Sequence, residues 1–91
     1  MNITQLKYLL EVAASASMRE AAAKLYVSQP ALSASIRELE EEIGILIFER
    51  TNKGVSLTGD GREFLTYAKG AVGQYEILER GAKVSEDDRV F

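Results

Sequence analysis

One stretch in the middle of the chain decides the fold, and it reads Ser28-Gln29-Pro30-Ala31-Leu32-Ser33-Ala34-Ser35-Ile36-Arg37-Glu38-Leu39. Ser28 is suited to cap a helix, and Pro30 follows within the first turn, where the missing N–H of proline costs least. Apolar residues then recur at spacings of 4, 3 and 4, namely Leu32, Ile36, Leu39 and Ile43. This spacing predicts a helix with one apolar stripe.

The face opposite the stripe carries groups that are suited to contact another molecule. At about 100° per residue, that face holds Pro30, Ser33, Ala34 and Arg37, with Gln29 at the helix entrance. It therefore offers an amide, a hydroxyl, small apolar groups and one guanidinium. The alternative is the solvated face of an ordinary core helix, and this segment alone leaves both interpretations open.

The composition narrows the class of protein. The 91 residues suffice for one small domain, with 46% hydrophobic and 27% charged residues. The sequence contains no cysteine and no histidine, which removes disulfides, the usual zinc ligands and the commonest general base. We therefore expect no enzyme, no cofactor and no metal site. Because there is no run of about 18 apolar residues and no charged leader, we expect a cytoplasmic protein without membrane contact.

The net charge of −3 argues against a general nucleic-acid binder, but the charge is unevenly distributed. It is +2 over residues 1–37, −5 over 38–49, +2 over 50–69 and −2 over 70–91. The acidic residues of the second segment are Glu38, Glu40, Glu41, Glu42 and Glu49. The overall charge therefore does not exclude DNA and instead restricts which surfaces can contact it.

Two short helices are predicted before the central helix. Asn2 can cap the first, and its apolar stripe is Ile3, Leu6, Leu10 and Ala13. Ser17 and Glu20 have the spacing of a capping box, which predicts a second helix over about 18–25. The connection Tyr26-Val27 is so short that the second and central helices together predict a helix-turn-helix. A plain three-helix bundle is the alternative.

The central helix is predicted to end at Gly44, because glycine adopts the left-handed conformation easily. Its last turn holds Glu40, Glu41 and Glu42, where the helix dipole disfavours anions. If this helix enters a major groove, these carboxylates must point away from the phosphates. Insertion by the N-terminal end alone meets this condition and is the usual docking of a helix-turn-helix.

A β-hairpin is predicted to follow. Residues 45–49 favour a strand, residues 50–54 a turn and residues 55–57 a returning strand. This hairpin has the proportions of a wing, with Arg50 and Lys53 near its tip. The alternative is an ordinary surface turn with solvated side chains.

Thr58 is predicted to cap a long final helix. Apolar residues recur along this helix at heptad-like spacing, in the order Phe64, Ala68, Ala71, Tyr75, Leu78 and Ala82. A small domain does not need so long a stripe, so we expect it to pack against the same helix of a second copy. The predicted organisation is a DNA-binding domain over 1–58, a linker and dimerisation helix over 59–83, and a tail or linker over 84–91.

Several motifs occur together in this sequence: Leu25-Tyr26-Val27-Ser28-Gln29-Pro30-Ala31-Leu32-Ser33, Ile36, Leu39-Glu40, Gly44, Phe48-Glu49-Arg50, Leu57-Thr58 and Gly61. With them the chain resembles the N-terminal DNA-binding domain of LysR-type bacterial transcriptional regulators, over about residues 2–82. The resemblance implies a mainly α fold, in which a winged helix-turn-helix with a three-helix core is followed by a long linker helix. It also implies a larger C-terminal effector-binding domain. We therefore expect the chain to be part of a longer regulator, with a stand-alone module as the alternative.

The resemblance also implies roles for residues of the central helix. Gln29 and Pro30 approach base edges, Gln29 by hydrogen bonds and Pro30 by contact with a thymine methyl group. Ser28 and Ser33 bind phosphates, and Arg37 reaches a phosphate or a base edge. The chemistry agrees, because glutamine can pair with adenine through two hydrogen bonds and hydroxyl groups hold phosphates.

The wing is implied to contact DNA through Lys53 in the minor groove or at its phosphates, with Arg50 close by. Two residues depart from the family pattern. Ala34 stands where relatives often carry a longer polar or basic side chain, which removes a potential base contact. Lys53 stands where many relatives have arginine, and lysine suits a narrow minor groove less well.

The leading hypothesis is a sequence-specific DNA-binding domain that acts as a homodimer on an interrupted palindromic operator of double-stranded DNA. By resemblance, the two linker helices pair in antiparallel fashion, and the full-length protein is expected as a dimer or a tetramer. A small-molecule effector is expected only for the absent C-terminal domain. A second hypothesis is a helical protein-interaction module that uses the acidic 38–42 surface and the 64–82 stripe. An enzyme has little support, because no nucleophile–base pair and no phosphate-binding glycine loop are visible.

Overall fold

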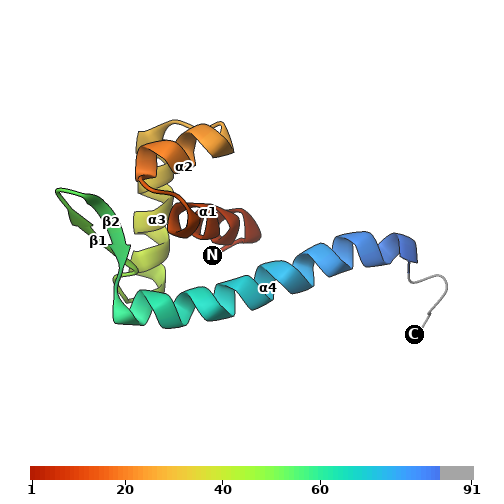
Figure 1. Ribbon diagram of the computed structural model, residues 1–91. Coiled ribbons are helices and arrows are strands. Elements are labelled where there is room, and N and C mark those ends of the chain that lie inside the picture. The colour runs from red at the N-terminus through yellow and green to blue at the C-terminus, as the bar shows by residue number, and fades with distance from the viewer. Residues whose placement is uncertain (85–91) are drawn as a thin grey trace.

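The computed structural model describes residues 1–84, the last three of them by their backbone only. Four helices and two strands follow one another in the predicted order (Figure 1). They are α1 (Ile3–Ala14), α2 (Met18–Leu25), α3 (Gln29–Ile43), β1 (Phe48–Thr51), β2 (Gly54–Leu57) and α4 (Gly59–Val84). The mainly α architecture with a two-stranded antiparallel hairpin is confirmed. Of the predicted tail over 84–91, all but the first residue lies outside the described residues.

Side-chain caps set where the first two helices begin. At α1 the side chain of Asn2 accepts a hydrogen bond from the Gln5 N–H at 2.8 Å, and the Gln5 side chain accepts one from the Asn2 N–H at 3.2 Å. This reciprocal pair is a capping box. The capping box predicted for α2 is only half correct. Ser17 accepts from the Glu20 N–H at 3.0 Å, but the Glu20 carboxylate binds the Ala16 N–H at 2.7 Å instead of that of Ser17.

The apolar stripe predicted for α1 is wrong in part. Leu6, Leu9 and Val12 are the buried apolar residues of this helix, whereas Ile3, Leu10 and Ala13 are half-buried at the edge of the core. The physical reason is that α1 packs against α2, α3 and α4 together. A helix with three neighbours buries a wider arc than a single stripe, so its apolar residues lie on several sides.

The central helix α3 follows its predicted pattern closely. Leu32, Ile36 and Leu39 are buried in the core, and Ile43 packs half-buried against it. The helix ends at Gly44, whose φ of 76° is left-handed and whose N–H donates to the Glu40 carbonyl oxygen at 2.9 Å. The boundaries of α3 therefore agree with the sequence-based prediction at both ends.

The hairpin is shorter than predicted, because its first strand begins three residues later, and its turn is also shorter. Strand β1 begins at Phe48, and in the antiparallel register Phe48 pairs with Leu57 and Thr51 pairs with Gly54. The turn is the two-residue Asn52-Lys53. Residues 45–47 do not form a strand, and Ile47 enters the core fully buried. The hydrophobic run that suggested a strand therefore serves to anchor the hairpin.

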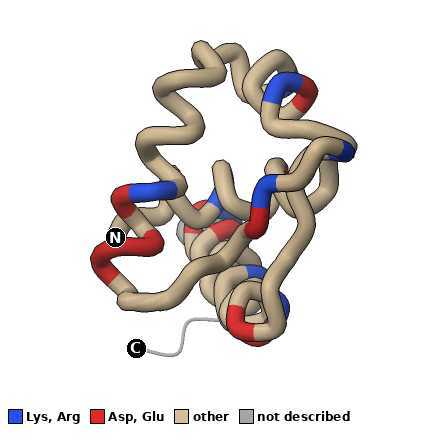
Figure 2. Tube along the Cα trace, turned by 90° about the vertical axis from the view of Figure 1, so that its left-hand side faces the viewer, with Lys and Arg blue, Asp and Glu red and all other residues tan. Residues whose placement is uncertain are grey.

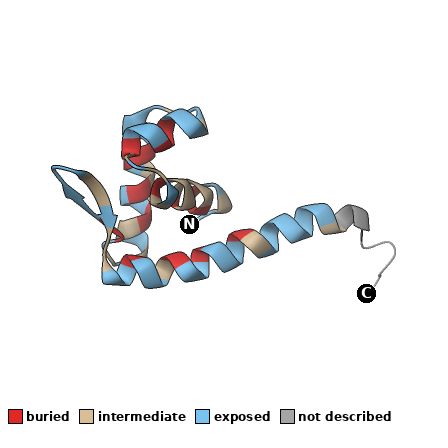
Figure 3. Ribbon diagram, in the orientation of Figure 1, coloured by how far each residue is buried: buried red, intermediate tan, exposed pale blue. Residues whose placement is uncertain are grey.

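Helix α4 begins under the domain and then extends away from it (Figures 1 and 3). Its buried side chains are those of Leu65, Ala68 and Val72, all in the first 14 residues of the helix, and α1 is the helix that it packs against. From Gln74 to Arg80 every residue is exposed. No helix in the described part of the chain is long and apolar enough to cross a lipid bilayer.

Candidate nucleic-acid interface

The N-terminal end of α3 is open to solvent. Ser28, Gln29, Pro30 and Ala31 are all exposed. The Ser28 hydroxyl oxygen accepts a hydrogen bond from the Ala31 N–H at 3.2 Å, which leaves its own hydrogen free to donate. The positive end of the helix dipole lies at this point and favours an anion. This end of α3 therefore combines a hydrogen-bonding amide, a small apolar ring and an anion-binding position.

The outward face of α3 is narrower than predicted. Ala34 and Arg37 are exposed on it as expected, but Ser33 is only 7% exposed. Both α1 and α2 pack against α3, and together they cover a wider arc than the apolar stripe alone. The placement of Ser33 on the exposed face is therefore wrong, and its hydroxyl offers little surface to a phosphate.

Lys53 lies at the tip of the wing, as predicted, and is exposed there. The turn is held by Thr51, whose hydroxyl oxygen accepts from the Lys53 N–H at 3.2 Å and whose O–H donates to the Gly54 carbonyl oxygen at 3.3 Å. Arg50 does not lie at the tip. It is exposed within β1, where it pairs with Val55.

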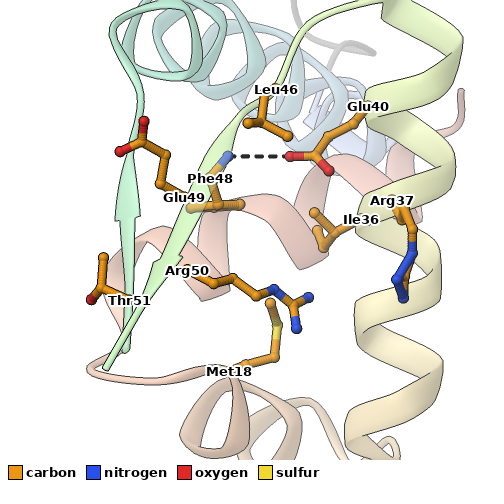
Figure 4. Close-up of a pocket in the computed structure, with 9 residues that line it drawn as sticks. All are labelled: Met18, Ile36, Arg37, Glu40, Leu46, Phe48, Glu49, Arg50 and Thr51. Carbon is orange, nitrogen blue, oxygen red and sulfur yellow. Dashed lines mark hydrogen bonds between the residues drawn. The ribbon is translucent and has the colours of Figure 1, made fainter. Parts of the chain in front are cut away.

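An open groove of about 530 Å³ separates α3 from the wing (Figure 4). Arg37 lines it from α3 and Arg50 from β1, and both side chains extend toward the same space. The residues that line the groove are Met18, Ile36, Arg37, Glu40, Leu46, Phe48, Glu49, Arg50 and Thr51. The structure therefore brings together two arginines that are 13 positions apart in the sequence.

Three acidic residues of α3, namely Glu38, Glu40 and Glu42, have partners within the domain. Figure 2 shows them gathered beside the N-terminus of the chain. The Met1 ammonium pairs with Glu42 at 2.6 Å, and the Gln5 amide donates to Glu38 at 2.8 Å. The Glu40 side chain lines the groove beside the wing, where its carboxylate binds backbone N–H groups. That the carboxylates of the last turn point away from DNA phosphates stays a prediction.

The predicted stripe of α4 divides between two surroundings. Ala68 is 2% exposed and Phe64 is half-buried, so both pack in the core of their own domain. Ala71, Tyr75 and Leu78 are exposed. The side chain of Ala82 lies outside the described residues. The prediction that Ala68 contributes to a free stripe is therefore wrong, because α1 covers that side of α4.

Two exposed tyrosines were missed by sequence reasoning. Tyr67 is exposed on α4 one turn before Ala71 and therefore extends its apolar face. Tyr26 is 95% exposed in the turn between α2 and α3, with a left-handed φ of 59°. The exposure of Tyr26 could have been predicted, because a two-residue connection leaves little room to bury an aromatic side chain. Among the described residues, no cluster of acidic, histidine or cysteine side chains could hold a metal ion.

Comparison with known proteins identifies the family. Residues 3–62 match the family described as "Bacterial regulatory helix-turn-helix protein, lysR family". The regulator ClcR of Pseudomonas putida is 41% identical over 69 residues, which cover 76% of this chain and 24% of ClcR. ClcR is several times longer than this chain. The chain likewise covers only 28% of the regulator TcbR of Pseudomonas sp. (strain P51), so it spans about a quarter of the length of these curated relatives.

Solved structures agree with this match. The BenM DNA-binding domain in complex with benA site 1 DNA has a TM-score of 0.86 and 35% identity, and the likeness covers 91% of this chain and 93% of that one. The CbnR DNA-binding domain in complex with DNA has a TM-score of 0.75 and 35% identity, covering 98% and 95%. The chain therefore belongs to the lysR family of bacterial regulatory helix-turn-helix proteins, as a winged helix-turn-helix domain for sequence-specific DNA binding.

Proposed function

We propose that α3 reads base edges in the major groove while the wing contacts the neighbouring minor groove. The observation that carries this proposal is the placement of five exposed groups. Gln29 and Pro30 begin α3, Lys53 ends the wing, and Arg37 and Arg50 line the groove between them. An α-helix fits the major groove, and a helix-turn-helix presents the N-terminal residues of its recognition helix there.

The chemistry of the helix end suits this role. The Gln29 amide can donate to and accept from adenine, and the Pro30 ring can contact a thymine methyl group. The Ser28 hydroxyl and the first N–H groups of α3 can bind a phosphate. Ala34 is exposed but carries only a methyl group, so its contribution is limited to an apolar contact.

The groove between α3 and the wing suits the sugar-phosphate strand that separates the two DNA grooves. Any duplex with α3 in one groove and the wing in the next must pass this strand between them. Arg37 and Arg50 extend toward that space from opposite sides. Guanidinium groups bind phosphate oxygens in a bidentate manner. We assign both arginines to phosphates of this strand and Lys53 to the minor groove or its edge.

A dimer through α4 would make this binding selective. Tyr67, Ala71, Tyr75 and Leu78 are exposed and apolar or aromatic, and their spacings of four, four and three keep them near one side of the helix. An exposed apolar strip of this kind indicates an interaction surface. Pairing with the same strip of a second copy would set two recognition helices on an interrupted palindrome, and the second half-site would then bind at high effective concentration.

The remaining parts of the proposal concern the longer protein. Because this chain spans about a quarter of the curated relatives that it matches, we propose that it is the N-terminal part of a transcriptional regulator in the bacterial cytoplasm. Its effector would be a small molecule bound by a C-terminal domain, and its assembly in the complete protein could reach a tetramer. The effector and the assembly of the complete protein are inferred from the family and not from any residue of the domain described above.

The experiment is a selection of duplexes from a randomised library by the 91-residue chain, followed by affinity measurements at several salt concentrations. We expect an enriched interrupted palindrome and a steep loss of affinity with salt, because phosphate contacts release counterions. Lys53→Ala should weaken the salt dependence, making the negative slope of log affinity against log salt shallower by about one unit. A chain that enriches no sequence and binds without salt dependence would instead support the protein-interaction module.

A further inference from the structure

We propose that Glu40 is the positioning residue that sets the direction of the wing relative to the recognition helix α3. The inference rests on the proposed function, because it concerns how Lys53 and Arg50 are brought to DNA at a set distance from Gln29. Glu40 itself is not assigned a DNA contact. Its carboxylate lies at the base of the groove, between the helix that reads the major groove and the strand that leads to the wing tip.

The carboxylate binds two consecutive backbone N–H groups. One oxygen of Glu40 accepts from the Ile47 N–H at 2.8 Å and from the Phe48 N–H at 3.2 Å. Figure 4 shows the second of these bonds. Phe48 is the first residue of β1. Hydrogen bonds to a charged acceptor are shorter and stronger than those between neutral groups. The start of the wing is therefore tied directly to the last turns of α3.

The same short segment is held from its other side by Thr58, the residue directly before α4. The Ile47 carbonyl oxygen accepts from the Thr58 N–H at 2.9 Å, and the Thr58 hydroxyl donates to the Leu46 carbonyl oxygen at 2.5 Å. The N–H groups of this segment thus face α3 and its carbonyl groups face Thr58. Removing Glu40 would release only the α3 side, and Thr58 would still hold the segment in the domain.

Glu40 fixes the β1 side of the wing base. The β2 side is held separately, because Val55 and Leu57 pack half-buried against the core and the Cβ position of Gly54 lies 3.2 Å from the Ala16 carbonyl oxygen. Within β1 only Phe48 is buried, while Glu49, Arg50 and Thr51 are exposed. A two-stranded hairpin has little stability or rigidity of its own. A shift of β1 at its base is passed along the β1–β2 pairing to the turn that carries Lys53. Glu40 therefore acts on DNA binding through the position of Lys53.

The electrostatics of the groove support the same assignment. A carboxylate near Arg37 and Arg50 would repel a phosphate strand and would compete for the guanidinium groups. Two N–H donors hold the Glu40 carboxylate against the wing segment instead. Glu41, the next residue, is exposed and makes no side-chain hydrogen bond within the described residues. Only Glu40 of this pair is placed to act on the wing.

The test is a double-mutant cycle on the selected duplex, with Glu40→Ala, Lys53→Ala and the double variant. We expect Glu40→Ala to weaken binding by about tenfold, and Lys53→Ala to have less than about a twofold further effect in that background. In a parallel cycle of Glu40→Ala with Gln29→Ala, the two changes in binding free energy should add, because α3 keeps its place in the domain. If Glu40→Ala weakened binding only by destabilising the fold, its coupling to Lys53 and its coupling to Gln29 would be the same.

Glu41→Ala is the matched control, since it removes the same charge one residue away and should leave affinity within about twofold of the parent chain. Glu40→Gln keeps an acceptor oxygen for the two N–H groups and should therefore bind the duplex more tightly than Glu40→Ala. If Glu40→Ala lowers the unfolding temperature, the cycle is measured well below that temperature. Full additivity of Glu40 and Lys53 would overturn this inference alone. A Lys53→Ala variant that binds the duplex like the parent chain would overturn the proposed role of the wing, and this inference with it.

Discussion

Gly61 in the first turn of α4 lies directly against the backbone of Ile47, just before the wing. A Cβ atom on Gly61 would overlap the Ile47 carbonyl oxygen and come within 2.8 Å of its carbonyl carbon. Gly61 is buried, and its N–H donates to the Thr58 hydroxyl oxygen at 2.8 Å. Only glycine therefore allows the start of α4 to approach the base of the wing this closely.

We expect Gly61→Ala to lower the free energy of unfolding by about 2 kcal/mol, because the added methyl group meets backbone atoms that cannot rotate away. Urea denaturation followed by circular dichroism measures the effect. Gly70→Ala is the control, since Gly70 lies in the same helix with nothing within 4 Å of its Cβ position. It should raise stability by about 0.5–1 kcal/mol. Equal stability of the two variants would contradict the close contact.

Replacing Gln29 should change which base is preferred rather than how strongly DNA is bound in general. Gln29 is exposed at the first position of α3, and a lost pair of hydrogen bonds to one base costs about 1–3 kcal/mol of discrimination. Gln29→Ala should therefore bind duplexes altered at one position of each half-site as well as it binds the selected sequence. Affinities for a panel of single-base variants provide the measurement. An unchanged preference profile would remove Gln29 from the reading role.

Two glutamate substitutions on α4 should have opposite consequences for folding. Leu78 is 71% exposed, so Leu78→Glu should leave the circular dichroism of the domain intact, yield a monomer in sedimentation and lose most affinity for a palindromic duplex. Ala68 is buried in the domain core, so Ala68→Glu should instead unfold the domain. A parent chain that sediments as a monomer at high micromolar concentration would contradict the dimer.

Tyr26 should be replaceable with a gain in stability. Its left-handed backbone disfavours a bulky residue, whereas its exposed side chain buries almost nothing. Asparagine tolerates this conformation, so Tyr26→Asn should raise the free energy of unfolding by up to about 1 kcal/mol. Thermal unfolding of both chains measures the difference, and Tyr26→Val should shift stability in the opposite direction. A loss of stability in the asparagine variant would show that the ring contributes to the fold.

The sequence by itself determined the features that depend on neighbours within a few positions. Ser28 caps α3, Gly44 ends it, and the spacing of Leu32, Ile36 and Leu39 places their side chains in the core. Each follows from local hydrogen bonding or from the helical repeat, which do not change with the rest of the fold. The family pattern rests on these same positions, so the winged helix-turn-helix could be recognised before any tertiary contact was known.

Only the tertiary structure decided which side of each element is covered. Ser33 and Ala68 were predicted to be free and are buried, because a neighbouring helix covers more of a surface than a single stripe reveals. Arg50 was predicted in the turn near the wing tip and lies in β1, because burial of Ile47 delays the start of the strand. The contact of Glu40 with the base of the wing was not predicted. Exposure and partnership depend on residues distant in sequence, and periodicity along one helix carries no information about them.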